Sequence, residues 1–168
     1  MQRKPPKTGP PSDPLELALR LLAIRARSAA EVRRALLRRG APAAAVDETL
    51  TILTRRGYLD DAAFATAYSQ SRGVARRRGP RRVAADLGSR GVSREIVEKA
   101  VRAAFGPGEE RRLAEAAAAR KWAALVRQPR AVALRRLAAH LSRQGFGPGV
   151  IAALLRERFG GGEMPELH

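Results

Sequence analysis

Three glycines at which predicted helices end constrain this chain most strongly, because the residues around them match in register. Gly40, Gly91 and Gly145 are spaced by roughly 50 residues, a period typical of helical repeats. We compared the residues that lie eight and four positions before each glycine and six and ten positions after it. At each of these four positions the residue is apolar in all three stretches. The matched sets are Val32, Val83 and Leu137; Leu36, Leu87 and Leu141; Val46, Val97 and Ile151; and Leu50, Val101 and Leu155. We predict stacked units that are each too small to bury an apolar face alone; unrelated amphipathic helices that end in glycine are the alternative.

The expected fold is all-α, an elongated and curved array of three tandem three-helix repeats with nine helices in all. Within the chain, no segment alternates apolar and polar residues as a half-buried strand would. The predicted boundaries are a disordered basic arm at 1–12, repeats at 13–57, 58–106 and 107–159, and a flexible tail at 160–168. Such an array offers long, shallow surfaces, which favours function by contact over catalysis in a deep pocket.

Local start and stop signals place the helices. Asp13 followed by Pro14, the Ser28–Glu31 capping box, Asp60 and Ser93 each mark a helix start. The first helix is expected to end near Arg27. A long alanine-rich helix is expected from about Glu109 to Val126.

The charge balance predicts an anionic partner. The chain has 33 Lys and Arg residues against 16 Asp and Glu residues, a formal net charge of +17. A GC-rich coding bias explains arginine in place of lysine, but it does not explain the excess of basic over acidic residues. The partner class is therefore nucleic acid, a nucleoprotein or an acidic protein face.

The arginines concentrate in the middle of the chain, around the second repeat's Gly79-Pro80 helix start. The cluster comprises Arg72, Arg76, Arg77, Arg78, Arg81 and Arg82, and we call it the arginine cluster. Guanidinium groups bind phosphate and carboxylate bidentately, so we interpret the cluster as a contact surface for an anion. A solvated helix end whose cations complement the helix dipole is the alternative. The doublets Arg33-Arg34, Arg38-Arg39 and Arg55-Arg56 extend the same track in the first repeat.

The sequence offers little for catalysis, metals or cofactors, and we predict none of these. There is no cysteine, and the histidines are His140, which we interpret as a surface or interfacial residue, and the C-terminal His168. The Asp60-Asp61 pair is interpreted as a helix cap in preference to a metal site. Aromatic residues make up 4% of the chain, and Phe64, Phe105 and Phe159 fall on apolar faces. Any nucleic-acid contact is therefore expected to be directed at the backbone and not sequence-specific. A long apolar run and a secretory signal are both missing, so we expect a cytoplasmic protein without a membrane span.

Three stretches resemble the RecX family, the regulatory proteins of the RecA recombinase. They are SAAEVRRALLRRG from Ser28, GYLDDAAFATAY from Gly57 and RGPRRVAADLGSRGVSREIVEKAV from Arg78. The resemblance covers about residues 13–159 and is strongest from Ser28 to Val101. It implies an all-α array of three-helix repeats that binds RecA filaments and DNA, restrains recombinase, ATPase and co-protease activity, and has no catalytic residues. The matching basic positions, Arg72, Arg76 to Arg78, Arg81 and Arg82, receive a contact role by this resemblance.

The resulting hypothesis is a monomeric, non-enzymatic regulator of the RecA–DNA filament in DNA repair and the SOS response. Its expected contact residues are the arginine cluster with Arg33, Arg34, Arg38 and Arg39, and its expected partners are the RecA filament and single- and double-stranded DNA. The alternative is an autonomous, non-specific DNA-binding protein whose helix-turn-helix-like units place a helix in the major groove. An enzyme is a remote third possibility.

Overall fold

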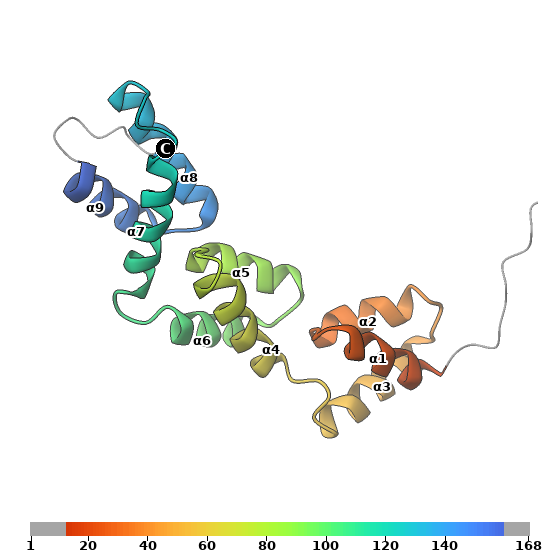
Figure 1. The fold of residues 1–168 in the computed structure, drawn as a ribbon. Coiled ribbons are helices and arrows are strands. Elements are labelled where there is room, and N and C mark those ends of the chain that lie inside the picture. Colours follow the sequence, from red (N-terminus) through yellow and green to blue (C-terminus); the bar gives the residue numbers. More distant parts are fainter. Residues whose placement is uncertain (1–12, 160–168) are drawn as a thin grey trace, which may run out of the picture. The chain divides into compact units, whose positions relative to one another are not determined.

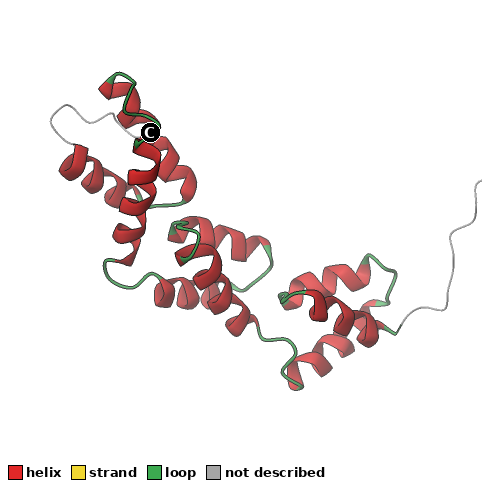
Figure 2. Cartoon of the chain, viewed as in Figure 1, coloured by secondary structure: helices red, strands yellow, loops and turns green. Residues whose placement is uncertain are grey.

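The computed structural model describes residues 13–159, which are helical and contain no strand (Figure 2). The all-α prediction is confirmed for this range, whereas the predicted arm and tail lie outside it. The helices are α1 (Pro14–Ile24), α2 (Ala29–Leu37), α3 (Ala43–Arg55), α4 (Asp61–Tyr68), the π-helix η1 (Ser69–Val74), α5 (Pro80–Ser89), α6 (Arg94–Ala104), α7 (Glu109–Trp122), α8 (Arg130–Gln144) and α9 (Pro148–Phe159).

The described chain divides into two compact units. The first contains the described residues up to Phe64 together with Arg90–Val92. The second contains Ala65–Ser89 and the described residues from Ser93 onward. The division falls inside α4, so each unit is described by itself below.

In the first unit α1, α2 and α3 pack pairwise around one small core (Figure 1). Its fully buried members are Ala18, Val32, Leu36, Val46, Leu53 and Leu59. The predicted caps form: Asp13 accepts from the Leu15 amide at 3.0 Å, and the Ser28 hydroxyl accepts from the Glu31 amide at 3.1 Å. The α1 helix ends at Ile24, earlier than the predicted Arg27, because the Arg27 guanidinium donates to the Leu21 carbonyl and caps the last turn instead of extending it.

The N-terminus of α2 is also capped from a distance within the first unit. Asp61 accepts from the Ala29 amide at 2.8 Å, one of the N–H groups that a helix start leaves unpaired. Its neighbour Asp60 caps α4 by accepting from two amides at 2.9 Å. The interpretation of this acid pair as a cap is thus confirmed, with each carboxylate serving a different helix.

Glu31 gathers several contacts at the same end of α2. Its carboxylate accepts from Arg25 at 3.0 Å and from Arg90 at 2.7 Å, and it also closes the capping box at the Ser28 amide. Burial alone would raise the pKa of Glu31, but the hydrogen bonds from Arg25 and Ser28 and the two arginine charges outweigh burial and lower the pKa. Glu31 is therefore ionised at neutral pH and binds these groups together.

In the second unit, α4 continues into η1, a π-helical turn that the sequence analysis did not predict. A Cβ on Gly73 would lie 2.7 Å from the Phe105 ring and 3.2 Å from Val83. The π-helical turn places the backbone of Gly73, which has no side chain, against α5 and α6. These two helices pack on η1 and on each other. Ser69, at the start of η1, is fully buried.

The helices α7, α8 and α9 also pack pairwise and supply most of the second unit's core. Phe146, directly after Gly145, is 2% exposed and belongs to this core. The rings of Trp122 and Phe159 pack in a tilted arrangement with centroids 4.5 Å apart. The α7 helix ends at Trp122 and not near Val126 as predicted. Its last amides switch to i→i+3 hydrogen bonds such as Leu125 to Trp122, which turns Leu125 into the core.

The start of α5 joins the end of α8 by backbone hydrogen bonds. The Gly79 amide donates to the Gln144 carbonyl at 2.8 Å, and the Arg81 amide donates to the Gly145 carbonyl at 3.1 Å. The donors left unpaired at one helix start thereby satisfy the acceptors left at another helix end. A Cβ on Gly79 would lie 2.2 Å from the Gly145 carbonyl carbon, so only glycine permits this approach.

The three glycines of the repeat register all have positive φ, at +83° for Gly40, +82° for Gly91 and +92° for Gly145. The matched residues eight before, four before and six after each glycine are all buried. Among those ten after, Leu155 is buried and the other two, Leu50 and Val101, are partly buried. The register therefore corresponds to equivalent core positions in the three groups of helices.

Candidate functional site

The arginine cluster lies on η1, on the turn that follows it and on the first turn of α5, all in the second unit. Arg76, Arg77 and Arg81 are exposed, and Arg72 is partly buried. Within the described residues, none of these four side chains has a hydrogen bond or ion pair. They carry positive charge that the described part of the chain leaves uncompensated.

The other two members of the cluster, the partly buried Arg78 and the exposed Arg82, are paired within the fold. Arg78 and Arg82 pair with opposite oxygens of Asp86 at 3.0 and 3.1 Å, and the Tyr68 hydroxyl donates to the same carboxylate at 3.2 Å. These contacts fasten the turn and the end of α4 to α5. The six arginines are thus not alike: four are unpaired, and two stabilise the fold around one acid.

Arg77 has an uncommon backbone conformation, with φ +54°. Its amide bonds to the Val74 carbonyl, and the next amide bonds to the Gly73 carbonyl, which is the Schellman pattern of a helix end. The same pair of hydrogen bonds ends helices at Gly40, Gly57 and Gly145. A non-glycine residue in this conformation costs about 1–2 kcal/mol, so an arginine occupies a position at which the backbone favours glycine.

The predicted contact arginines of the first unit lie on α2 and the turn after it. Arg33 pairs with Asp47, Arg34 donates to the Arg90 carbonyl at 3.3 Å, and Arg39 donates to the Ala35 carbonyl at 3.3 Å. Arg38 is exposed and has no hydrogen bond or ion pair among the described residues.

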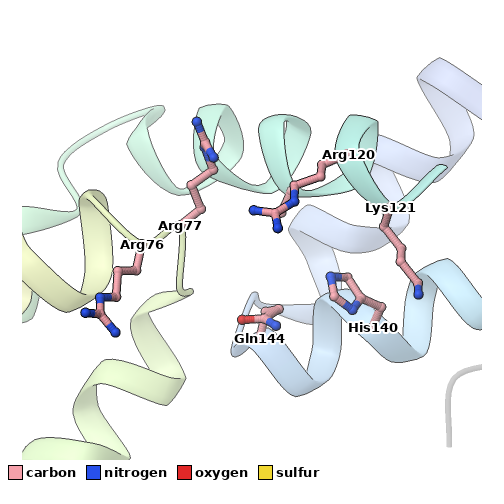
Figure 3. A pocket seen from close by; sticks show the side chains of 7 residues that line it. Arg76, Arg77, Arg120, Lys121, His140 and Gln144 are labelled. Atoms are coloured by element: carbon pink, nitrogen blue, oxygen red, sulfur yellow. The ribbon is translucent and has the colours of Figure 1, made fainter. Parts of the chain in front are cut away.

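The second unit contains a hollow of about 330 Å³ lined by four cationic side chains and no carboxylate. Its lining residues are Arg76, Arg77, Ala117, Arg120, Lys121, His140 and Gln144, and we call it the cationic hollow. Figure 3 shows Arg120 reaching from α7 toward His140 and Gln144 of α8, with Lys121 descending beside His140 and Arg76 extending away from them. The α5–α8 joint at Gly79 places the arginine-bearing turn at this hollow.

His140 has a lowered pKa. Burial is the main cause, and the positive charges of Lys121 and Arg143 act in the same direction. The imidazole is therefore mainly neutral at pH 7 and offers one N–H donor and one acceptor nitrogen. The interpretation of His140 as a surface or interfacial residue agrees with its partly buried position.

Sequence analysis did not connect Arg120, Lys121, His140 and Gln144 with the arginine cluster. One signal was present, because His140 and Gln144 are four residues apart and share a helix face. The approach of α7 and of the turn near Arg77 depends on tertiary packing, and nothing in the local sequence indicates it. Tyr58, which is 57% exposed, was not predicted as a surface aromatic either.

Comparison with known families gives two matches on this chain. The model of the first three-helix domain of RecX matches residues 15–53, and the model of the second three-helix domain of RecX matches residues 60–101. The matched ranges contain most of α1–α3 and of α4–α6. Regulatory protein RecX of Thermobifida fusca is 36% identical over 141 residues, which are 84% of this chain and 76% of that protein.

The chain belongs to the RecX family. Regulatory protein RecX of Mycobacterium marinum is 36% identical over 163 residues, 92% of this chain and 94% of that protein. The Deinococcus radiodurans RecX protein is 37% identical over 145 residues, 85% of this chain and 67% of that protein.

Solved RecX structures share the fold. RecX from Lactobacillus salivarius superposes with a TM-score of 0.77 at 18% identity, covering 87% of this chain and 94% of that one. A second crystal structure of a regulatory protein RecX gives a TM-score of 0.79 at 21% identity, covering 86% and 72%. At these identities the likeness concerns the fold alone.

None of the helices in residues 13–159 is both long and apolar enough to cross a bilayer. The same range contains no group of three or more His, Cys, Asp or Glu side chains arranged to hold a metal ion.

Proposed function

We propose that this chain is a non-enzymatic regulator that binds RecA–DNA filaments and restrains their recombinase, ATPase and co-protease activities in DNA repair and the SOS response. Its membership of a family of regulatory proteins supports the regulatory part of the proposal. The observation that carries the contact is the uncompensated charge of Arg72, Arg76, Arg77 and Arg81. Both the DNA and an acidic face of a coating protein would present the anions that these guanidinium groups bind.

The distribution of acidic side chains supports an external partner for these arginines. Among the described acidic residues, only Glu48 and Glu95 lack a hydrogen bond or ion pair. The others accept from backbone amides or pair with arginines other than Arg72, Arg76, Arg77 and Arg81. Most carboxylates among residues 13–159 are therefore already engaged. Within this range the unpaired arginines have no protein counter-charge, so solvent ions would accompany them, and release of those ions favours binding to a polyanion.

The proposal includes three copies of one helical repeat, at 13–57, 58–106 and 107–159, arranged as an elongated, curved array. The positive φ of the three register glycines and the burial of the matched apolar positions support a repeated structure. The arginine cluster belongs to the central copy. Repeated modest contacts along a filament would add through avidity without any single deep pocket.

Contacts are expected to be non-sequence-specific. Arginine forks address phosphate oxygens, which carry no sequence information directly. The aromatic side chains that stack on bases in single-strand binders are here partly buried, as with Phe64, Phe105 and Phe159, except for Tyr58.

Charge reversal tests this proposal. Arg76, Arg77 and Arg81 are changed together to Glu, and inhibition of RecA-driven strand exchange is measured over a range of regulator concentrations. We expect the half-inhibitory concentration to rise at least about tenfold, since a charge-assisted hydrogen bond contributes about 1.5–3 kcal/mol. Arg78 and Arg82 stay unchanged because they hold Asp86 within the fold.

The matched control reverses Arg102, Arg127 and Arg135, three exposed arginines of the second unit outside the cluster. It makes the same change in net charge, and far-UV circular dichroism checks that both variants keep their helices. Equal loss of inhibition in the two triple variants would show that the loss depends only on net charge. The arginine cluster would then not be the contact site. Full inhibition by the cluster variant would do the same.

A further inference from the structure

The cationic hollow combines side chains from three segments that are distant in the sequence. The turn after η1 supplies Arg76 and Arg77, α7 supplies Arg120 and Lys121, and α8 supplies His140 and Gln144, with Ala117 in the wall. No carboxylate lines it (Figure 3). Every charged group facing His140 across the hollow is therefore a cation, and Arg143 on its own helix adds another.

The two cations from α7 differ from the other basic residues of that helix. Arg111 pairs with Glu115 at 3.1 Å and Glu157 at 2.5 Å, and Arg112 pairs with Glu109 at 2.6 Å. Arg120 and Lys121 have no hydrogen bond or ion pair within residues 13–159. In α7, therefore, the arginines that are paired with acids lie in its first turn, whereas the unpaired Arg120 and Lys121 line the hollow.

Arg77 adds a second, independent observation. It occupies a left-handed position at which glycine would relieve backbone strain, and its side chain makes no hydrogen bond within the described chain. Among residues 13–159, no side-chain hydrogen bond or ion pair of this arginine offsets its conformational cost. Strain of this kind is found where a side chain serves binding or catalysis.

We propose that the cationic hollow is a binding site for a phosphate group. The guanidinium groups of Arg77 and Arg120 can each bind the oxygens of a tetrahedral oxyanion, Lys121 supplies a further positive charge, and the Gln144 amide and the His140 imidazole offer neutral donors. The hollow's 330 Å³ leaves space for the anion and accompanying water. The hollow shares Arg76 and Arg77 with the proposed contact surface, but phosphate binding there rests on the hollow's own charges and geometry and does not require the regulation of RecA.

The phosphate has two chemical sources, a nucleic-acid backbone and free inorganic phosphate. His140 reports on both, because an anion beside the ring stabilises its protonated form and raises its pKa. The experiment follows the His140 ring proton by NMR from pH 5 to pH 8 in the full chain. His140→Gln assigns the signal against that of His168. The additions are inorganic phosphate in one arm and a short oligothymidylate in the other, with ionic strength held constant by chloride.

We expect at least one addition to move the His140 titration to higher pH in the unaltered protein. Arg77→Gly and the double variant Arg120→Gln, Lys121→Gln should each weaken that binding by about tenfold or more. Arg135→Gln, which removes an exposed arginine of α8 outside the hollow, should leave it unchanged. Arg77→Gly keeps the test free of misfolding because glycine suits the backbone at that position.

A response to oligothymidylate alone assigns the hollow to nucleic-acid backbone, and a response to inorganic phosphate alone assigns it to the free anion. No response to either probe overturns the proposal. A shift that chloride at equal ionic strength reproduces, or that persists unchanged in the hollow variants, overturns it as well. RecA is absent from this experiment, so a negative NMR titration does not test whether the protein regulates RecA. Conversely, a protein that fails to inhibit strand exchange could still bind phosphate in the hollow.

Discussion

Replacing Arg77 by glycine should make the protein more stable while weakening its contact with anions. Arg77 lies at the left-handed position of a Schellman helix end, with φ +54°. Gly40, Gly57 and Gly145 occupy the corresponding position at three other helix ends. The exposed guanidinium makes no hydrogen bond or ion pair among residues 13–159, so removing it breaks no contact there.

The magnitude follows from two opposing effects. A residue with a Cβ in this conformation costs about 1–2 kcal/mol. Glycine returns that amount but loses about 0.5–1 kcal/mol because its unfolded chain has more conformational freedom. The net gain expected for Arg77→Gly is therefore about 0.5–1 kcal/mol of unfolding free energy, which for a chain of this size raises the thermal midpoint by roughly 2–4 °C per kcal/mol.

The assay is urea unfolding followed by circular dichroism, with two controls. Gly57→Ala adds a Cβ at an equivalent helix end where no atom lies within 4 Å, so it measures the conformational cost alone and should destabilise by about 1 kcal/mol. Arg77→Ala keeps the strained conformation but removes the guanidinium, so it should change stability little.

A stability loss in Arg77→Gly, or equal stability of the glycine and alanine variants, would refute this reasoning. Either result would show that the arginine stabilises the fold or that its backbone is unstrained. In either case the backbone of Arg77 would no longer indicate a role in binding.

Three further changes test other parts of the fold. Glu31→Gln should lower the free energy of unfolding by about 1–2 kcal/mol at pH 7 because it weakens a helix cap and two arginine contacts. Because the folded-state pKa of Glu31 is lowered, its stabilising contribution is present above the ordinary glutamate pKa and is lost as pH falls through the folded value. The free energies of unfolding at pH 7 and pH 3 should therefore differ less in the variant than in the unaltered protein. Gly79→Ala places a Cβ 2.2 Å from the Gly145 backbone and should destabilise by about 2 kcal/mol or more in urea unfolding, well beyond the Gly57→Ala control. The lowered pKa of His140 means that the unfolded chain takes up a proton first as pH falls below about 6.5, so stability should decline there and the His140→Gln variant should decline less.

Helix starts were predictable because their chemistry is local. Ser28 and Glu31 are three residues apart and satisfy each other's backbone donors wherever the helix packs, and Asp60 caps the residues that follow it. The apolar positions around Gly40 were equally predictable, because periodicity and burial are linked in a helix. All of these signals lie within one turn or one helix.

Features set by distant packing were not predictable. The π-helical turn at η1 depends on the approach of Gly73 to Phe105, and the early end of α7 depends on burying Leu125 in a core built by later helices. Neither depends on a local motif. In an alanine-rich stretch the helical propensity continues past the true end, so the sequence predicts a longer helix than the packing allows.

The candidate site shows the same division. The arginine cluster was visible as charge density, and the Arg82–Asp86 pair has the i, i+4 spacing of a helix-surface ion pair. The second arginine on Asp86 and the approach of α7 to the turn near Arg77 arise only in the folded unit. Sequence therefore located the region of positive charge, and folding determines which of its arginines remain available.

Binding to bare and RecA-coated DNA tests the central claim most directly. A labelled single-stranded oligonucleotide, with and without RecA, is titrated with the protein at increasing salt while fluorescence anisotropy is recorded. Affinity for the bare strand should fall with a log–log slope near −0.7 for each phosphate neutralised. We predict tighter binding to the coated strand, persisting at salt concentrations where the bare strand is released. Equal or weaker binding to the coated strand would contradict the account and support an autonomous DNA-binding protein.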